Sequence, residues 1–335
     1  MPNILLTQKC IRSCPYCFAR KHMHDAPPED ILKWEDLIYI ADFFQSGGDS
    51  NISLLGGEPF LHPEIVDFIL YIISRGMHVT VFTSGVVSEK MLVDAIERLE
   101  HVDPAMLSFV VNLNNPKETP FSENETIGRF LSAFARFTTL SINVYKLGFD
   151  YSYALNTINK YGLQRHIRLG LAHPIPGKKN MCITPDKMRQ MAQELMDYFP
   201  TLEAFDIHLG FDCGMPMCIF TDDELGKLFK HTFGHVNFHC GSAIDIGPDL
   251  EVWSCFPLST YNKKSLLEFQ NHRELCEYFD SFHKAVRVEL GGLYEKCDYC
   301  DYRKKDLCSG GCLSHCLNKF VNEAKIRNAQ VYPIK

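Results

Sequence analysis

The chain has no long apolar segment. No run approaches the roughly 20 residues that a helix needs to cross a bilayer, which excludes a membrane-spanning helix. The opening residues, MPNILLT, have neither a charged n-region nor the hydrophobic stretch of a signal peptide. We therefore expect a cytoplasmic protein in a reducing compartment, where clustered thiols are metal ligands rather than disulfides.

The chain also has no excess of positive charge. It contains 34 Lys and Arg residues against 41 Asp and Glu residues, for a net charge of −7. This argues against a general nucleic-acid binder, and we expect the basic run Arg303-Lys304-Lys305 to be a solvated turn. With 335 residues, of which 46% are hydrophobic, the chain is globular and long enough for one large domain and a smaller one.

Cysteine, by contrast, is abundant, with 14 residues. Three of them follow a short apolar run near the start, in the pattern C-x3-C-x2-C, and they supply three thiolates without a local fourth: Cys10, Cys14 and Cys17. A [4Fe–4S] cube held by three cysteines keeps one iron open for a ligand. The alternative is a structural zinc site with His22 or His24 as its fourth ligand.

Apolar runs alternate with helical periodicity from residue 1 to about residue 210. Pro63 can start a helix that ends at Gly76, and Thr184-Pro185 opens another helix whose methionines fill the core. The expected strands are 3–7, 51–55, 78–83, 107–113, 140–146 and 166–171, with a possible further strand at 205–210.

Repeated strand–helix units imply parallel strands with right-handed crossovers. We therefore expect an α/β fold, an open and partial (β/α)6 TIM-like barrel whose functional loops gather at the carboxyl ends of the strands. After residue 220 the pattern changes to a short strand, a hairpin and cysteine-dense loops. The sequence therefore predicts a barrel domain at 1–220 and a cysteine-rich domain at 221–335.

A second motif, Gly56-Gly57-Glu58-Pro59, follows the second expected strand. Two glycines let the backbone approach a ligand closely, and a carboxylate at a strand end can accept hydrogen bonds from an ammonium group. A glycine turn between a strand and a helix is common on its own. Its position one strand–helix unit after the three-cysteine loop makes the pair specific.

The three-cysteine loop and the glycine motif resemble those of the radical S-adenosylmethionine (SAM) enzymes. In that family the open iron of the cluster chelates SAM, and one electron splits SAM to give a 5′-deoxyadenosyl radical. The resemblance implies that the glycine motif holds the amino group of SAM and that Tyr16 is the aromatic residue usual before the third cysteine. It also implies further contacts with SAM at strand ends, from Thr83, Ser84, Asn112, Asn114 and Arg168.

Two of these assignments have an equally simple structural alternative. The hydroxyls of Thr83 and Ser84 could cap a helix, and the strand residue Arg168 could be an ion-pair partner.

A second group of cysteines lies near the end of the chain. Cys240 and Cys255 flank an expected hairpin at 243–253, with a turn at 247–249, which brings these two thiols together. Five more follow in the pattern C-x2-C-x7-C-x3-C-x3-C: Cys297, Cys300, Cys308, Cys312 and Cys316.

This group resembles the SPASM extension of radical SAM enzymes, which binds two auxiliary [4Fe–4S] clusters. By that resemblance the cluster nearer the active site takes Cys240, Cys255 and Cys312. The outer cluster takes Cys297, Cys300, Cys308 and Cys316. The seven residues between Cys300 and Cys308 are more than the family usually has, the gap before the last cysteine is shorter, and a cysteine common upstream of Cys240 is missing.

These departures leave the ligand sets open. The nearer cluster is three-cysteine ligated and open to substrate, or it is completed by Cys213, Cys218 or a histidine. The later cysteines could also hold a single auxiliary cluster beside spectator thiols, or four of them could bind zinc. Cys213 and Cys218 follow the last barrel-like strand, and each could instead donate a hydrogen atom to a substrate radical or be a buried residue without a role.

The resemblance implies an enzyme with SAM and three [4Fe–4S] clusters as cofactors, which modifies a peptide by a crosslink, a thioether bond or epimerisation. Phe256 follows Cys255 where the sulfatase-maturing branch has an aspartate base, which argues against a seryl or cysteinyl oxidase. A dehydrogenase or epimerase of a small sugar or amino sugar is the alternative, and an iron–sulfur electron carrier is the non-enzymatic one.

The expected partners are the substrate and a reducing electron donor of the flavodoxin or ferredoxin type. Because the first strand begins at Asn3, we expect no N-terminal peptide-recognition domain, so a precursor peptide would be held by a separate peptide-recognition protein or by an open barrel mouth.

Overall fold

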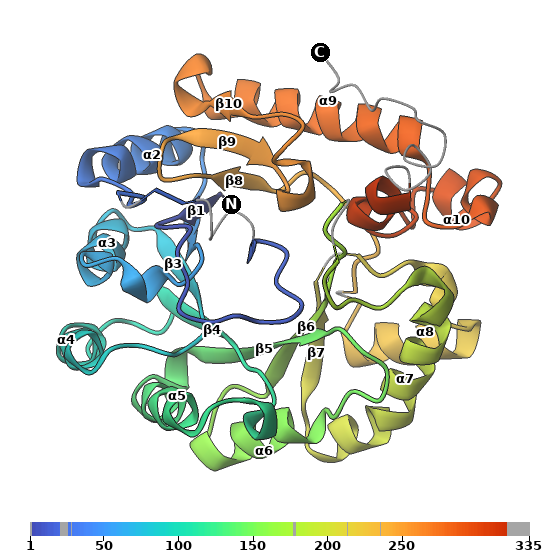
Figure 1. Cartoon of the computed structure of the whole chain (residues 1–335), viewed down its shortest axis with the longest axis horizontal. Helices are drawn as coiled ribbons and strands as arrows, with labels where there is room; N and C mark the ends of the chain where they lie inside the picture. The colour runs from blue at the N-terminus through green and yellow to red at the C-terminus, as the bar shows by residue number, and fades with distance from the viewer. Residues whose placement is uncertain are drawn as a thin grey trace.

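The computed structural model describes residues 2–20, 26–27, 29–176, 179–212, 214–234 and 236–319. Within these ranges ten strands form one sheet in the order β10-β9-β8-β1-β2-β3-β4-β5-β6-β7. The sheet curves around a central space and stays open, because its end strands β7 and β10 do not pair with each other (Figure 1). The strands are β1 (Asn3–Leu5), β2 (Asn51–Leu55), β3 (His78–Thr83), β4 (Leu107–Asn112), β5 (Thr138–Val144), β6 (His166–Leu171), β7 (His208–Phe211), β8 (Ile244–Ile246), β9 (Glu251–Ser254) and β10 (Lys264–Ser265).

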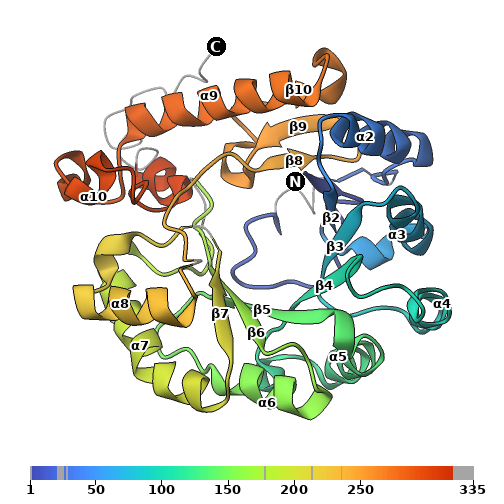
Figure 2. The same ribbon diagram turned by 180° about the vertical axis from the view of Figure 1, so that it is seen from behind.

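Helices surround the outer side of the sheet, and α9 lies across β9 beside α2 (Figures 1 and 2). Residues 313–319 form a last helical stretch of the described chain. The helices before that stretch are α2 (Trp34–Ser46), α3 (Ile65–Ser74), α4 (Glu89–Leu99), α5 (Phe121–Ala133), α6 (Ser152–Tyr161), α7 (Met188–Ala204), α8 (Asp222–His231), α9 (His272–Leu290) and α10 (Asp301–Lys304).

The core lies between the sheet and these helices. Alternate strand residues, such as Ile52, Leu54, Val79 and Val81, are fully buried in it, because successive side chains of a strand point to opposite faces of the sheet. The residues between them, such as Ser53, point to the inner face. The inside of the curved sheet therefore carries polar side chains.

The prediction of an open α/β barrel is confirmed. Strands β1 to β7 pair in parallel with their neighbours in the chain. The helix expected at Pro63 is α3, and Gly76 follows it with φ of +76°. The last expected strand begins later than predicted, at His208, because α7 extends to Ala204 and Asp206 has φ of +52°.

The predicted hairpin is also present, as β8 and β9, and it joins the barrel sheet. Strand β8 pairs in parallel with β1, with Asp245 opposite Asn3, and β9 pairs antiparallel with β8. One continuous sheet therefore crosses residue 220, and the domain boundary there stays a prediction.

Four α-helical segments of the described chain after residue 220 contradict the expectation of only a strand, a hairpin and loops: α8, α9, α10 and the stretch at 313–319. Helix α8 starts with a capping box of Thr221 and Glu224. Helix α9 starts at His272 and is capped by Asn271, whose side chain accepts a hydrogen bond from the backbone N–H of Glu274 at 3.0 Å. Both caps can be recognised in the sequence as a polar residue followed three positions later by Glu. Helices α8 and α9 were missed because each buries only a narrow apolar stripe.

None of the helices in the described part of the chain is long and apolar enough to span a membrane.

Candidate functional site

The three-cysteine loop runs from β1 into the space enclosed by the sheet (Figures 1 and 2). Its start is held by Asp30, whose carboxylate accepts a hydrogen bond from the hydroxyl of Thr7 at 3.1 Å. Its far end is held by the loop after β6, where the N–H of Met181 donates to the carbonyl of Pro15 at 3.1 Å. The three thiols are half-buried, and none of them forms a disulfide.

The glycine motif packs against the backbone of this loop. The N–H of Gly57 donates to the carbonyl of Thr7, and the N–H of Glu58 donates to the carbonyl of Lys9, both at 2.8 Å. A Cβ atom on Gly56 would lie 2.2 Å from the carbonyl oxygen of Thr7, and one on Gly57 would lie 2.0 Å from that of Lys9. The glycines were predicted to let the backbone approach a ligand. In the structure they approach the chain itself, so the motif fixes the start of the cysteine loop.

The carboxylate of Glu58 is buried, at 1% exposure, and accepts four hydrogen bonds. Its Oε1 accepts from the hydroxyl of Thr83 at 2.7 Å and from the N–H of Phe60 at 3.2 Å. Its Oε2 accepts from the N–H of Ser84 at 2.8 Å and from the hydroxyl of the same residue. Pro59 begins the 3-10 turn η1 (Pro59–Leu61), which supplies Phe60.

These bonds occupy the roughly four lone-pair positions of a carboxylate. Burial raises the pKa of Glu58 above its ordinary value, and the hydrogen bonds from Ser84 and Thr83 lower it. The role of Glu58 as a ligand of the SAM ammonium group stays a prediction. Binding the ammonium group requires the hydroxyl of Thr83 or Ser84 to rotate its hydrogen away from the carboxylate.

Tyr16 joins the cysteine loop to the ends of β4 and β5. Its hydroxyl donates to Asn114 Oδ1 at 2.5 Å and accepts from Asn112 Nδ2 at 3.0 Å. Asn114 in turn donates to Cys14 Sγ at 3.4 Å. The ring of Tyr16 stacks on Tyr145, with centroids 5.0 Å apart. Burial raises the pKa of Tyr16 well above its ordinary value.

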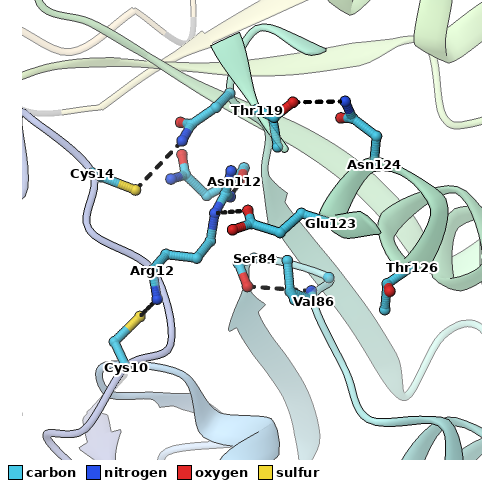
Figure 3. Close-up of polar contacts among 12 residues, drawn as sticks. Cys10, Arg12, Cys14, Ser84, Val86, Asn112, Thr119, Glu123, Asn124 and Thr126 are labelled. Carbon is cyan, nitrogen blue, oxygen red and sulfur yellow. Dashed lines mark hydrogen bonds and ion pairs between the residues drawn. The ribbon is translucent and has the colours of Figure 1, made fainter. Parts of the chain in front are cut away.

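Arg12 is a buried cation inside the cysteine loop, and no motif of the sequence had marked it as part of the site. Its Nε lies 3.1 Å from Glu123 Oε2 in the first turn of α5, and its Nη1 donates to the carbonyl of Asn112 at 3.4 Å (Figure 3). The backbone N–H of Arg12 donates to Cys10 Sγ at 3.4 Å. These contacts hold the loop against β4 and α5.

Arg168, predicted either to contact SAM or to form an ion pair, does the second. Its Nη2 lies 2.7 Å from Asp212 Oδ2 at the end of β7, and its guanidinium lies over the ring of Phe82 at 5.2 Å. The pair links β6 to β7 on the inner face. A contact between Arg168 and SAM stays a prediction.

A cavity of about 130 Å³ opens beside the Tyr16 network, at the carboxyl ends of β4 and β5. Its lining includes Asn114, Asn143, Tyr145, Lys146 and Glu118. Asn143 also donates to Asn112 Oδ1 at 2.7 Å, so the cavity and the cysteine loop share one set of amide side chains.

The donor set is chemically suited to an iron–sulfur cluster, because cysteine thiolates are the usual ligands of such clusters. Among the described residues, no three His, Cys, Asp or Glu side chains are placed to hold a metal ion. Each cysteine of a [4Fe–4S] cluster binds a different iron, so its thiols stand further apart than those around one zinc. The alternative zinc ligands His22 and His24 lie outside the described residues. Burial raises the pKa of Cys10 to about 11, so binding a metal releases a proton.

Two of the C-terminal thiols, Cys240 and Cys316, lie against one face of α9. Cys240 Sγ is 3.6 Å from His283 Nε2, and one turn later Arg287 Nη1 donates to Cys316 Sγ at 3.9 Å. The Nε and Nη2 atoms of Arg287 are buried without a hydrogen-bond acceptor in the described chain. Unpartnered cationic donors beside thiols fit an anionic cluster, whose sulfurs accept hydrogen bonds.

The remaining predicted residues lie in several places. Cys297 lies in the 3-10 turn η8 (Glu295–Asp298), Cys300 immediately precedes α10, and Cys312 immediately precedes the helix at 313–319. Cys308 Sγ accepts from the N–H of Met217 at 3.5 Å, in the 3-10 turn η5 (Met217–Ile219) that also carries Cys218. Cys255 ends the hairpin with φ of +81°. Cys213 lies outside the described residues.

Two aromatic residues connect the two cysteine regions. The ring of Phe18, which follows Cys17, lies 5.0 Å from the ring of Phe256, which follows Cys255. In the sequence, Phe256 was notable only because it stands where the sulfatase-maturing branch has an aspartate. No local sequence pattern relates Phe18 to Phe256, which lie far apart in the chain.

Comparisons with known proteins give a family and a fold. Residues 4–147 match the model of the family described as Radical SAM superfamily. Molybdenum cofactor biosynthesis protein 1 of Mus musculus is 36% identical over 67 residues, which are 20% of this chain and 10% of that protein. The match thus spans only a small part of this relative.

Two solved structures resemble nearly the whole chain. Native anSMEcpe with bound AdoMet and Kp18Cys peptide is 15% identical, with a TM-score of 0.64 over 98% of each chain. Streptococcus suis SuiB bound to its precursor peptide SuiA is 14% identical, with a TM-score of 0.64 over 99% of this chain and 74% of that one. At such identity the likeness shows a shared fold.

Proposed function

The chain belongs to the radical SAM superfamily through residues 4–147, and we propose that it is a radical SAM enzyme that modifies a peptide. The observation that carries the proposal is the joint placement of the three-cysteine loop and the glycine motif, held together by backbone hydrogen bonds at the carboxyl ends of β1 and β2. The peptide is the finer part of the proposal, and it rests on an apolar rim around the cysteine loop.

The proposed ligands of the SAM-binding [4Fe–4S] cluster are Cys10, Cys14 and Cys17. Cluster and SAM, when bound, supply a 5′-deoxyadenosyl radical that takes a hydrogen atom from a substrate carbon. The chain supplies position and redox tuning. Asn114 donates to Cys14 Sγ, and Arg12 places its backbone N–H on Cys10 Sγ. Hydrogen bonds to ligand sulfurs are a known control of cluster potential.

The apolar rim supports a peptide substrate. Ile11 and Phe18 belong to the loop and are 50% and 42% exposed. Met181, 44% exposed, is bonded through its N–H to the loop, and Phe121, 77% exposed, starts the helix that holds Arg12. Large exposed apolar side chains in and beside one loop suit a partner with apolar side chains of its own. Each of the two similar structures contains a bound peptide.

The first experiment tests the enzyme class. Protein reconstituted with iron and sulfide without oxygen is mixed with SAM and a strong reductant, and 5′-deoxyadenosine is measured. We expect release from the wild type and none from Cys10→Ala/Cys14→Ala/Cys17→Ala. Cys276→Ala is the matched control, because Cys276 lies on α9 with its Sγ 3.1 Å from His272 Nε2, away from the loop. Absence of 5′-deoxyadenosine from the wild type would reject the proposal.

The second experiment tests the substrate. Short peptides encoded beside the gene are synthesised and added to the same reaction, which is followed by mass spectrometry in heavy water. A crosslink or thioether removes two hydrogens from the peptide, and an epimerisation exchanges one for deuterium. Phe121→Asn, which lies outside the cysteine loop, should raise KM for the peptide while SAM cleavage without peptide stays unchanged.

A small-molecule substrate is the second candidate, favoured by the resemblance of residues in this chain to molybdenum cofactor biosynthesis protein 1. Faster 5′-deoxyadenosine release with sugars or nucleotides, and no response to peptides, would decide for it.

A further inference from the structure

The loop after β7 runs beside the cysteine-dense C-terminal segment. The N–H of Met217 donates to Cys308 Sγ at 3.5 Å. A Cβ atom on Gly214 would lie 3.3 Å from Cys312 Cβ, and one on Gly311 would lie 3.7 Å from Pro216 Cβ. Residues 214–218 therefore lie alongside residues 308–312 in space, although about 90 positions separate the two segments in the chain.

Cys218 is the thiol that this loop brings to the segment. It follows Met217 in η5, it is half-buried, and it forms no disulfide. Its sulfur is close enough to Cys297 and Cys308 to interact with them electrostatically, and it also contacts the side chain of Lys296. Two of the predicted outer-cluster ligands are thus its neighbours.

Cys316 lies on another side of the same segment. It lies in the helix at 313–319, four residues after Cys312, which immediately precedes that helix. Its sulfur accepts from Arg287 on α9, next to the contact between His283 and Cys240. Cys316 is also close enough to Cys312, Cys240 and Cys297 to interact with them electrostatically.

We propose that Cys218 is the fourth ligand of the outer auxiliary cluster and that Cys316 is the fourth ligand of the inner one. The outer set is then Cys218, Cys297, Cys300 and Cys308, and the inner set is Cys240, Cys255, Cys312 and Cys316. This inference rests on the proposed function, because it presupposes two auxiliary clusters. It differs from the resemblance-based assignment, which placed Cys316 in the outer cluster.

Assigning Cys218 to the outer cluster and Cys316 to the inner cluster has a chemical consequence. Four thiolates leave no iron of either auxiliary cluster open, so a substrate cannot bind to iron there. The two auxiliary clusters then serve electron transfer, and the substrate is held by protein side chains alone.

The test removes one cluster at a time and asks which cysteine still matters. Cys297→Ala/Cys300→Ala removes the outer cluster, about four irons per chain. In that background we expect Cys316→Ala to remove the remaining auxiliary iron or to leave the electron paramagnetic resonance (EPR) signal of a three-iron cluster, while Cys218→Ala changes nothing. Cys240→Ala/Cys312→Ala removes the inner cluster, and there we expect the reverse. Cys276→Ala should be silent in both backgrounds.

Two results would overturn the assignment. One is loss of iron on Cys316→Ala only while the outer cluster is present, and the other is full iron on Cys218→Ala in both backgrounds. SAM cleavage is measured in every sample as a separate readout, since it depends on the three-cysteine loop. Wild type that holds auxiliary iron but cleaves no SAM would reject the proposed function and still decide the ligand sets.

Discussion

Arg12 and Glu123 form an ion pair, 3.1 Å from Nε to Oε2, between the cysteine loop and the first turn of α5. The side chain of Arg12 is 5% exposed and that of Glu123 is 24% exposed. Arg12 lies between Cys10 and Cys14 in the chain, so this contact fixes the backbone between two proposed cluster ligands (Figure 3).

The first prediction concerns this pair. Arg12→Met keeps much of the side-chain volume but leaves Glu123 without its cation, and we expect a loss of about 1–3 kcal/mol in the free energy of unfolding of the metal-free protein. Urea unfolding followed by circular dichroism measures it. Arg129→Met is the control, because Arg129 and its partner Glu89 are both more than half exposed, and exposed ion pairs contribute little to stability. Equal losses for the two variants would contradict a special role of Arg12.

The strands of the barrel were predictable because each is a continuous apolar or alternating run bounded by turn residues. β2, β3 and β6 lie where the sequence placed them. Helix α9 could not be predicted from the sequence, because only Leu275, Phe279 and Val286 among its apolar residues are buried. The remainder of its surface is polar or exposed. The parallel pairing of β8 with β1 joins residues about 240 positions apart, and no local pattern encodes it.

The proposed site was predictable in its motifs and not in its contacts. The spacing of the cysteines and the glycine motif is local, so both could be read from the chain. The hydrogen bonds of Thr83 and Ser84 to Glu58, the ion pair of Arg12 and the ion pair of Arg168 each join different strand ends. Such contacts depend on how the barrel brings those ends together, so a residue could be expected at the site without its partner being known.

The second prediction concerns Glu58, whose four acceptor positions are occupied. Ser84→Ala removes one hydroxyl donor and frees a position on Oε2, so SAM affinity should be kept or raised if Glu58 binds the ammonium group. Glu58→Gln removes the charge and should lower SAM affinity by roughly 10-fold to 150-fold, the equivalent of about 1.5–3 kcal/mol for a charged hydrogen bond. Equilibrium dialysis with labelled SAM measures both. Unchanged affinity in Glu58→Gln, with a lower unfolding midpoint, would make Glu58 purely structural.

The third prediction concerns iron content. Three [4Fe–4S] clusters require about 12 irons per chain after anaerobic reconstitution, and Cys10→Ala/Cys14→Ala/Cys17→Ala should remove about a third of them. Colorimetric iron and sulfide determination tests this. Stoichiometric zinc with only about four irons in anaerobically purified protein would be incompatible with three clusters.

The fourth prediction concerns Arg287, whose Nε and Nη2 are buried and unpartnered in the described chain beside Cys316. A nearby cation favours the more negative, reduced state of a cluster, so Arg287→Met should shift the midpoint potential of the inner auxiliary cluster to a lower value. An interaction of about 1.4 kcal/mol corresponds to about 59 mV for one electron, which makes a shift of tens of millivolts measurable by EPR-monitored titration. Arg303→Met, on α10 and ion-paired with Asp298, should leave that potential unchanged, and an equal shift there would remove the special role of Arg287.

The last prediction concerns pH and Asp245, a buried residue of β8 whose Oδ1 accepts from Asn3 Nδ2 at 2.8 Å. Burial raises the pKa of Asp245 from 3.8 to about 7. Between these values the unfolded chain carries an ionised carboxylate while the folded chain keeps it neutral, so folding takes up a proton. The contribution of this residue therefore makes the protein less stable as pH rises from about 4 to about 7, and the loss is complete above pH 7, where it reaches at most about 4 kcal/mol. Asp245→Asn removes the titration, so its advantage in unfolding free energy over the wild type should grow between pH 5 and pH 8. Asp94→Asn, on the exposed surface of α4, should show no such trend, and an advantage of Asp245→Asn that is the same at every pH would mean that the carboxylate is already ionised in the folded protein.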